Sequence, residues 1–460
     1  MLQSFKKIHI IGIGGIGVSA LAKLLSRRGA EVSGSDLVVS DITKELEFDG
    51  RRIFIGQAAE NVPTDCDLII YSPAVPVDNP ERVLARERGI VEMSYPEALG
   101  ELTKEFRTIA VAGTNGKSTT TAMLGLILVE AGFDPTVIVG TKVPSFKHGN
   151  MRVGKGGSWL VVEACEYREH FLHLQPEFAV ITNIEEDHLD YYRDLAHIKE
   201  AFQKFVDKVP EIGRVIFNAD DESCRELVYK NSTSFGIENG EYRAINRISG
   251  LGQQTFELWQ DNNHLGDIVL QIPGSFNVMN AMAAAVTALS VLVPFGAVQA
   301  GLEKFFGVWR RFERVGKFKD ADVFSDYGHH PTAIKGTLEA AREFFPDRRL
   351  VLCFQPHQHE RTKTLFNDFV DSFTGADVLI IPEIFAVAGR TDDLNISSQD
   401  LVKAIKEKYP TKEIVYAENL STAEKLLHEL VQPGDVLIIQ GAGDVDSLAR
   451  KITSVQGSVL

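Results

Sequence analysis

The chain has 460 residues, of which 44% are hydrophobic and 24% are charged, and its formal net charge at pH 7 is −15. This composition predicts an ordinary globular protein of about three domains, and the acidic balance argues against a nucleic-acid binder, which needs a basic face. We expect a cytoplasmic protein without a membrane partner, because no apolar run approaches the roughly 20 residues of a membrane span and the N-terminus turns Gly-rich too early for a secretory signal.

The N-terminal stretch predicts a βαβ unit of the Rossmann type. A strand (KKIHII) runs into a GxGxxG turn at Gly12, Gly14 and Gly17, a helix follows, and a second strand ends at Asp36. Such glycines let the backbone approach a diphosphate, and the acid commonly meets a ribose hydroxyl. A later strand ends at Ser72, at the same expected sheet edge. The turn alone leaves three uses open: a dinucleotide, a nucleotide-sugar, or only tight packing of helix on strand.

Residues 108–120, TIAVAGTNGKSTT, predict a binding turn for a nucleoside triphosphate. Backbone N–H groups of such a turn and of the following helix bind phosphates. Lys117 would reach the β- and γ-phosphates, and the Ser118 hydroxyl would ligate Mg²⁺. A Gly-rich turn that only caps a helix is the alternative. The ATP-binding residues predicted here are Gly113, Thr114, Asn115, Gly116, Lys117, Ser118 and Thr119.

Two further strands are expected to bring metal ligands to the same sheet edge. Glu163 emerges from the apolar strand in SWLVVEACE, and His188 follows another strand in TNIEEDHLDYY. Mg²⁺ takes oxygen ligands and keeps several waters, so one carboxylate with phosphate oxygens suffices. We therefore expect the metal at Ser118, Glu163 and His188. For the acids at 185–187, a solvated helix start is the alternative.

Alternating strands and helices predict an α/β fold with mostly parallel sheets. Short polar–apolar alternation over 232–273 predicts a small antiparallel patch in the middle of the chain. A polar stretch at 95–107 and an Arg-containing junction near 311–319 are the expected separators. The predicted domains are an N-terminal Rossmann-like domain (1–103), a central P-loop ATPase-type domain (104–313) and a C-terminal Rossmann-like domain (314–460).

Two His-rich loops follow strands of the third domain, in SDYGHHPTA and FQPHQHERT. We expect His330, His357 and Arg361 to contact substrate. A zinc site is the alternative, although no cysteine lies close by. Arg311, at the domain junction, can stabilise a transferring phosphoryl group or form a salt bridge across a hinge.

These motifs together resemble those of the Mur ligases, the ATP-dependent amide ligases of bacterial cell-wall synthesis. The likeness is greatest to the branch that joins L-alanine to UDP-N-acetylmuramate. Asn115 departs from the usual family His, and Gln358 from the Arg typical of that branch. The motifs that carry the resemblance, in the family's order, are IGIGGIGVSALA with GSD, SPAVPVDNPE, AGTNGKSTTTAM, EACE with FLHLQP, TNIEEDHLDYY, GSFNVMNAMAA, RRFE, DYGHHPTAI, FQPHQHERT and QGAGD.

The resemblance implies a ligase of peptidoglycan precursor synthesis that uses ATP and Mg²⁺. The muramoyl carboxylate would attack the γ-phosphate, and the L-alanine amine would then displace phosphate from the acyl phosphate. The resemblance places Asn277 and Asp326 near adenosine and Arg311 near the phosphates. Catalysis is expected at Lys117, Glu163, His188 and Arg311. The residues implied for the uridine diphosphate are Gly14, Gly15, Ser35, Asp36 and Ser72.

Two other functions stay open at this point. A related ligase could add another amino acid or a recycled murein peptide. In a different class, the chain could be a nicotinamide-dependent oxidoreductase with an ATPase domain. The sequence specifies neither the base that deprotonates the amine nor the oligomeric state.

Overall fold

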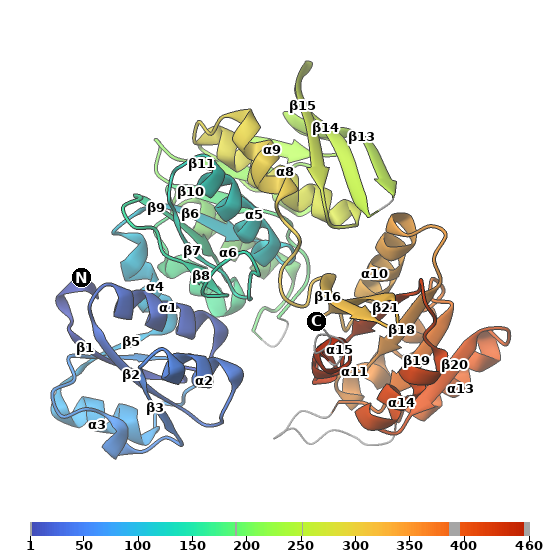
Figure 1. Cartoon of the computed structure of the whole chain (residues 1–460). Helices are drawn as coiled ribbons and strands as arrows, with labels where there is room; N and C mark the ends of the chain where they lie inside the picture. The colour runs from blue at the N-terminus through green and yellow to red at the C-terminus, as the bar shows by residue number, and fades with distance from the viewer. Residues whose placement is uncertain (1, 189–190, 251, 386–395, 455–460) are drawn as a thin grey trace. The chain divides into compact units, whose positions relative to one another are not determined.

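The computed structural model describes residues 2–188, 191–250, 252–385 and 396–454. Within these residues the strands form sheets of five, ten and six strands (Figure 1). The predicted α/β class with three sheets is therefore confirmed. No helix in the described part of the chain is both long and apolar enough to cross a bilayer. By internal packing the chain divides into two units, one of Met1–Ile245, Glu257–Asp267 and Met279–Leu302, the other of Asn246–Phe256, Ile268–Val278 and Glu303–Leu460.

The first sheet has the strand order β3-β2-β1-β4-β5, with every pairing parallel. Its strand order reverses between β1 and β4, and ligands of open α/β sheets bind at such a switch point. The turn after β1 and the end of β4 therefore form the expected ligand edge. Its elements are η1 (Leu2–Ser4), β1 (Lys7–Ile11), α1 (Ile16–Arg27), β2 (Glu31–Asp36), α2 (Asp41–Phe48), β3 (Arg52–Ile55), η2 (Ala59–Asn61), β4 (Leu68–Tyr71), α3 (Pro80–Arg88), β5 (Val91–Ser94) and α4 (Tyr95–Thr103).

Helix α4 occupies most of the stretch that we expected only as a polar separator. Ser94 and Glu97 form a capping box, in which each side chain accepts from the other residue's backbone N–H. One helix face buries Ala98 and Leu102 in the core. The charged residues of this stretch thus belong to the outer face of an amphipathic helix.

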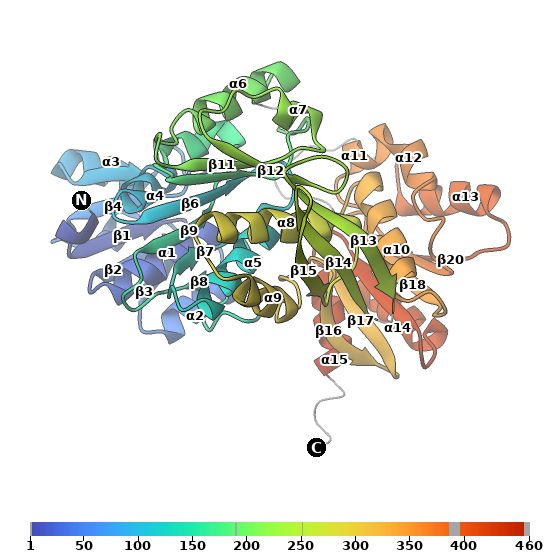
Figure 2. The ribbon, with the colours of Figure 1, turned by 90° about the horizontal axis from the view of Figure 1, so that it is seen from above.

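The second sheet has the order β15-β14-β13-β12-β11-β10-β6-β9-β7-β8. Strands β6, β9 and β10 are parallel neighbours, so their carboxyl ends meet at one edge. β14 and β15 are joined by only two residues, 261–262, which requires an antiparallel pair. Figure 2 shows these two strands beside β13, where the antiparallel patch was predicted.

The strands of this sheet are β6 (Arg107–Ala112), β7 (Thr136–Ile138), β8 (Met151–Arg152), β9 (Trp159–Glu163), β10 (Phe178–Ile181), β11 (Arg214–Asn218), β12 (Ser232–Gly236), β13 (Tyr242–Gly250), β14 (Gln253–Gln260) and β15 (Asn263–Leu270). The helices between and after them are α5 (Lys117–Glu130), η3 (Tyr167–His173), α6 (Leu195–Val206), α7 (Glu222–Arg225), α8 (Ser275–Ser290) and α9 (Phe295–Glu303).

The third sheet has the order β16-β17-β21-β18-β19-β20, and only its β16–β17 pair is antiparallel. β18, β19 and β21 are buried at every residue, as expected for parallel strands covered on both faces. The elements are β16 (Glu313–Phe318), β17 (Ala321–Asp326), α10 (Pro331–Phe344), β18 (Leu350–Phe354), α11 (His359–Thr364), α12 (Phe366–Val370), β19 (Val378–Pro382), α13 (Ser398–Lys408), β20 (Glu413–Ala417), α14 (Leu420–Leu430), β21 (Val436–Gln440) and α15 (Val445–Ser454).

Candidate active site

The Gly-rich turn lies between β6 and α5, as predicted. At two of its positions the backbone conformation and the lack of room for a Cβ require glycine. Gly113 and Gly116 have φ of +138° and +84°. A Cβ at Gly113 would lie 2.0 Å from Thr182 Oγ1, and one at Gly116 would lie 2.2 Å from Asn280 Oδ1. Asn280, in α8, was not predicted at this site; the available signal was a second amide, three residues after Asn277, in a mostly apolar helix.

Hydrogen bonds to the loop after β10 fix the shape of the turn. Thr114 N donates to Asn183 O at 3.0 Å, and Asn115 N donates to Asn183 Oδ1 at 2.8 Å. Glu185 N donates to Thr114 Oγ1 at 2.9 Å. Because α5 begins at Lys117, the N–H groups of its first turn have no intrahelical acceptor and can bind phosphate.

The Lys117 ammonium lies between the Gly-rich turn and the buried carboxylate of Glu166. Its Nζ donates to Glu166 Oε1 at 2.9 Å, to Thr114 O at 3.1 Å and to Gly113 O. The Glu166 side chain is only 3% exposed. No role for Glu166 was predicted from the sequence. Its position three residues after Glu163, in the loop that follows β9, was the signal that could have found it.

Ser118 and Glu163, two of the three predicted metal ligands, are in direct contact. The Ser118 hydroxyl donates to Glu163 Oε2 at 2.9 Å and lies 3.1 Å from Oε1. Gly140 N also donates to Glu163 Oε2, at 2.7 Å. A hydroxyl and a carboxylate beside a phosphate-binding turn are a donor set that fits Mg²⁺.

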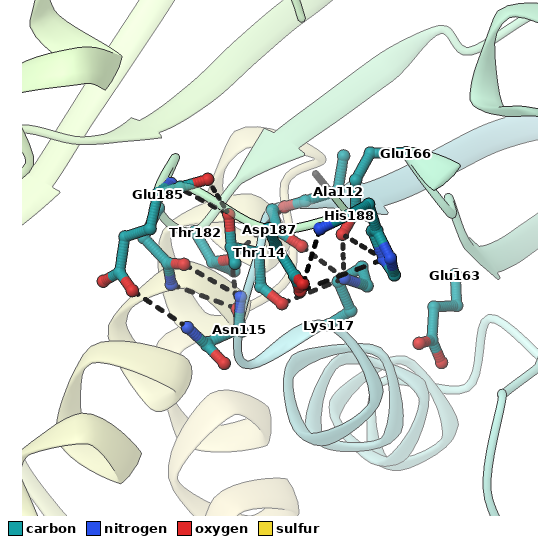
Figure 3. A network of polar contacts seen from close by, with 12 residues as sticks. Ala112, Thr114, Asn115, Lys117, Glu163, Glu166, Thr182, Glu185, Asp187 and His188 are labelled. Atoms are coloured by element: carbon teal, nitrogen blue, oxygen red, sulfur yellow. Dashed lines mark hydrogen bonds and ion pairs between the residues drawn. The ribbon is translucent and has the colours of Figure 1, made fainter. Parts of the chain in front are cut away.

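His188, the third predicted ligand, lies in a neighbouring cluster. Its Nε2 is 3.9 Å from Glu166 Oε1 and 3.9 Å from Asp187 Oδ2. The ligand atoms of Glu166, Asp187 and His188 lie within 4.8 Å of one another, and no other group of this kind is found among the described residues. Figure 3 shows these side chains gathered at Lys117, with Glu163 to one side. Residues 189–190 lie outside the described part of the chain.

The residues predicted for a nucleotide diphosphate lie at the carboxyl edge of the first sheet. Gly14 N donates to Asp36 Oδ2 at 2.8 Å, and a Cβ at Gly12 would lie 2.9 Å from Ser72 Cβ. Ser35 is different, because it is fully buried and its hydroxyl donates to Glu81 Oε2 at 2.6 Å. Its backbone O accepts from Gly12 N at 2.8 Å. Ser35 therefore holds the turn through its main chain.

At Gly15 the backbone is the ordinary N-cap of α1, with φ −64°. The nearest contacts of a Cβ there would be Gly12 O and Val18 Cγ2, both at 3.4 Å. Unlike its neighbours in the turn, Gly15 is therefore not required by packing.

In the second unit, the His-rich loops surround one guanidinium. Arg361 Nη1 lies 3.4 Å from His357 Nδ1. Burial, and next the charge of Arg361, lower the pKa of His329 to about 4. Partial burial and Arg361 also lower the pKa of His330. Neutral imidazoles beside a permanent cation form a surface suited to an anionic group such as a carboxylate.

The other predicted residues of this unit lie at strand and helix ends. Asp326 Oδ2 accepts from Phe312 N at 2.9 Å, and Asp326 Oδ1 accepts from Gly328 N at 2.7 Å. Arg311 is exposed, with its guanidinium carbon 5.0 Å from the centre of the Tyr327 ring. Asn277 is buried in α8, where Nδ2 donates to Pro273 O at 2.7 Å.

Family models match three consecutive segments of the chain. They are described as "Mur ligase family, catalytic domain" for residues 7–107, "Mur ligase middle domain" for residues 111–288 and "Mur ligase, glutamate ligase domain" for residues 310–443.

Whole-chain relatives agree with these models. A UDP-N-acetylmuramate--L-alanine ligase of Clostridium novyi (strain NT) is 42% identical, covering 96% of this chain and 95% of its own. The protein of that name from Geotalea uraniireducens (strain Rf4) is also 42% identical, covering 97% of both chains. The crystal structure of UDP-N-acetylmuramate-alanine ligase from Thermotoga maritima has a TM-score of 0.86 at 30% identity, covering 99% of this chain and 100% of its own. A murein peptide ligase from Psychrobacter arcticus has a TM-score of 0.68 at 25% identity, covering 99% of both chains.

Proposed function

Because the chain belongs to the Mur ligase family, we propose that it is an ATP-dependent ligase that joins L-alanine to the carboxylate of UDP-N-acetylmuramate. The observation that carries this function is the 42% identity to a ligase of that name, over 96% of this chain and 95% of the relative. The reaction belongs to peptidoglycan precursor synthesis. We place it in the cytoplasm, where ATP is supplied.

The first step of the reaction brings together two anions, the muramoyl carboxylate and ATP. A muramoyl carboxylate oxygen attacks the γ-phosphorus of ATP, the bond to the β-phosphate oxygen breaks, and ADP leaves. The L-alanine amine then attacks the carbonyl carbon of the acyl phosphate, inorganic phosphate leaves with the bonding electron pair, and the amine loses a proton to form the amide. Both steps need positive charge around the phosphoryl group.

Residues of the Gly-rich turn are arranged for the first step. The N-terminus of α5 binds phosphate oxygens, and Lys117 contacts the transferring group once it leaves Glu166. Ser118 and Glu163 would hold Mg²⁺, which would neutralise phosphate charge. Arg311 is included among the catalytic residues as a further cation. His330, His357 and Arg361 bind the incoming amino acid through its carboxylate.

We also assign one ligand to each sheet. The first domain, 1–103, binds the sugar nucleotide at the edge formed by Gly14, Gly15, Asp36 and Ser72. The central domain, 104–313, binds ATP, and the C-terminal domain, 314–460, binds the amino acid and contributes Asp326 near adenosine.

The two alternatives are less well supported. The murein peptide ligase structure is 25% identical with a TM-score of 0.68, against 30% and 0.86 for the alanine-adding ligase. An oxidoreductase would use the first sheet for a dinucleotide, yet residues 7–107 match a Mur ligase model.

The test is a screen of all twenty amino acids for phosphate release in the presence of ATP, Mg²⁺ and UDP-N-acetylmuramate. We expect L-alanine to give the highest kcat/KM. A clear preference for another amino acid, or a response only to a peptide, would reject the assignment.

A further inference from the structure

Glu81, in α3, carries a buried carboxylate that the proposed chemistry does not use. Its side chain is fully buried. Oε2 accepts from Ser35 Oγ at 2.6 Å and lies 3.2 Å from His9 Nε2. Oε1 accepts from Asn61 Nδ2 at 2.7 Å and from Ala58 N at 3.1 Å. Because a buried charge without such partners is very unfavourable, the carboxylate holds all four groups around itself.

The partners of Glu81 belong to three neighbouring strands of the first sheet. His9 lies on β1, Ser35 lies on β2, and residues 58–61 follow β3. Burial opposes ionisation of the carboxyl group, but hydrogen bonds with these partners outweigh burial and lower the pKa of Glu81 below its usual value. Hydrogen bonds to an ionised group are roughly twice as strong as those between neutral groups. Glu81 therefore ties α3 firmly to β1, to β2 and to the segment after β3.

The end of β2 that Glu81 holds also supports the Gly-rich turn after β1. Ser35 O accepts from Gly12 N at 2.8 Å, and Asp36 Oδ2 accepts from Gly14 N at 2.8 Å. Ser35 thus contacts Glu81 through its side chain and the turn through its main chain. A displacement of Ser35 would move the backbone N–H groups of this turn, which are the groups expected to face a diphosphate.

We propose that Glu81 is a positioning residue for the uridine diphosphate. Through Ser35 it fixes the turn at Gly12–Gly14, and through Ala58 and Asn61 it fixes the segment that follows β3. Both segments lie at carboxyl ends of parallel strands, the edge at which open α/β sheets bind ligands. Segments that are already ordered bind a ligand more tightly, because less entropy is lost on binding. The inference rests on the proposed use of this edge for the sugar nucleotide.

Calorimetric titration of the full chain with UDP alone tests this role, and a thermal melt shows that each variant is folded at the temperature used. Glu81→Ala should weaken UDP binding at least about tenfold, as expected when the displaced turn loses one hydrogen bond to a charged phosphate. ATP binding, at another sheet, should be unchanged. The matched control is Glu87→Ala, which removes an exposed acid of the same helix and should bind UDP as the wild type does.

The conservative variant Glu81→Gln separates the hydrogen bonds from the charge. Its amide oxygen can accept from Asn61 and Ala58, while its NH₂ group can donate to Ser35 and His9. It should therefore restore most of the affinity that Glu81→Ala loses. A loss in Glu81→Gln as large as that in Glu81→Ala would contradict positioning by these hydrogen bonds.

Wild-type UDP affinity in a folded Glu81→Ala with a lowered thermal midpoint would show that Glu81 only stabilises the domain, and would overturn the proposal. If Glu81→Ala does not fold, Ser35→Ala removes a single hydrogen bond of the network and should weaken UDP binding at least about threefold. Unchanged UDP binding by Ser35→Ala would then overturn the proposal. Absence of UDP binding by the wild type would reject the sugar-nucleotide assignment itself, and that outcome is distinct from a wild type that binds UDP and a Glu81→Ala that binds it equally well.

Discussion

The Ser118 hydroxyl donates to Glu163 Oε2 at 2.9 Å, although the two residues are 45 positions apart. The contact arises because β6 and β9 are parallel neighbours in register. The helix that follows β6 then starts beside the end of β9. The sheet itself thus brings a hydroxyl and a carboxylate together.

This contact predicts that Glu163→Gln raises the Mg²⁺ requirement. The substitution keeps the shape of the side chain but removes an anionic ligand. We expect half-saturation by Mg²⁺ to rise at least about tenfold, since loss of even an outer-shell partner commonly costs that much. A Mg²⁺ titration of ADP formation measures it, with Glu186→Gln as the exposed control. Equal Mg²⁺ curves for Glu163→Gln and wild type would remove Glu163 from the metal site.

Lys117→Ala should lower turnover by at least about 10³-fold, because a cation on the transferring phosphoryl group is lost. Binding of the uridine nucleotide, at another sheet, should be retained and can be followed by calorimetry. The same variant leaves the buried Glu166 without its partner, so the central domain should lose about 3 kcal/mol of stability. Adding Glu166→Gln should restore much of the thermal midpoint but none of the turnover. Recovery of turnover in the double variant would contradict the phosphoryl role.

Gly15→Ala separates the sugar-nucleotide function of the first turn from its packing. The folded chain has room for this Cβ, whose nearest contacts would be at 3.4 Å. A diphosphate approaching the backbone would not have that room. We expect UDP-N-acetylmuramate binding to weaken at least about tenfold, as for one lost hydrogen bond to a charged group. ATP binding should be unchanged. The matched control is Gly296→Ala, whose Cβ would meet nothing within 4 Å. Unchanged binding by Gly15→Ala would place the diphosphate elsewhere.

His329 should remain neutral throughout the physiological pH range. Burial and Arg361 lower its pKa to about 4, against about 6.5 for an exposed imidazole. Between these two pKa values the His329 imidazole is protonated in the unfolded chain and neutral in the folded chain. The contribution of this group to stability is therefore complete above pH 6.5 and is lost as pH falls toward 4.

An imidazole NMR titration measures this directly, with His329→Gln to assign the signal. A midpoint near 4 is expected, and His264, an exposed imidazole beside Asp267, serves as the comparison. A midpoint for His329 at or above 6 would contradict the burial argument.

The sequence was most informative where local pattern and chemistry coincide. The strand, Gly-rich turn and helix around Lys117 could be predicted because glycine, lysine and serine at that spacing are typical of a phosphate-binding turn. Helix α4 was missed as a packed element, although Ser94 and Glu97 carry the capping-box spacing, because its polar residues suggested a separator between domains. Pro96 is at the start of the helix, where proline is tolerated.

Contacts between distant segments could not be predicted in the same way. The Lys117–Glu166 ion pair spans 49 positions and depends on how the β9 loop turns back over the phosphate turn. Ser35, which the resemblance implied for the uridine diphosphate, is buried, and its hydroxyl donates to Glu81, 46 positions away on α3. Side-chain direction at a strand end follows from tertiary packing, which a single sequence does not specify.

The most direct test of the function measures ADP formation by the purified chain with ATP and Mg²⁺ while each co-substrate is omitted in turn. We expect ADP and phosphate in equal amounts only when UDP-N-acetylmuramate and L-alanine are both present. Mass spectrometry should show one new product, heavier than the sugar nucleotide by one alanine residue. ADP formation that is independent of either co-substrate, or full turnover without that product, would contradict the assignment as an L-alanine-adding ligase.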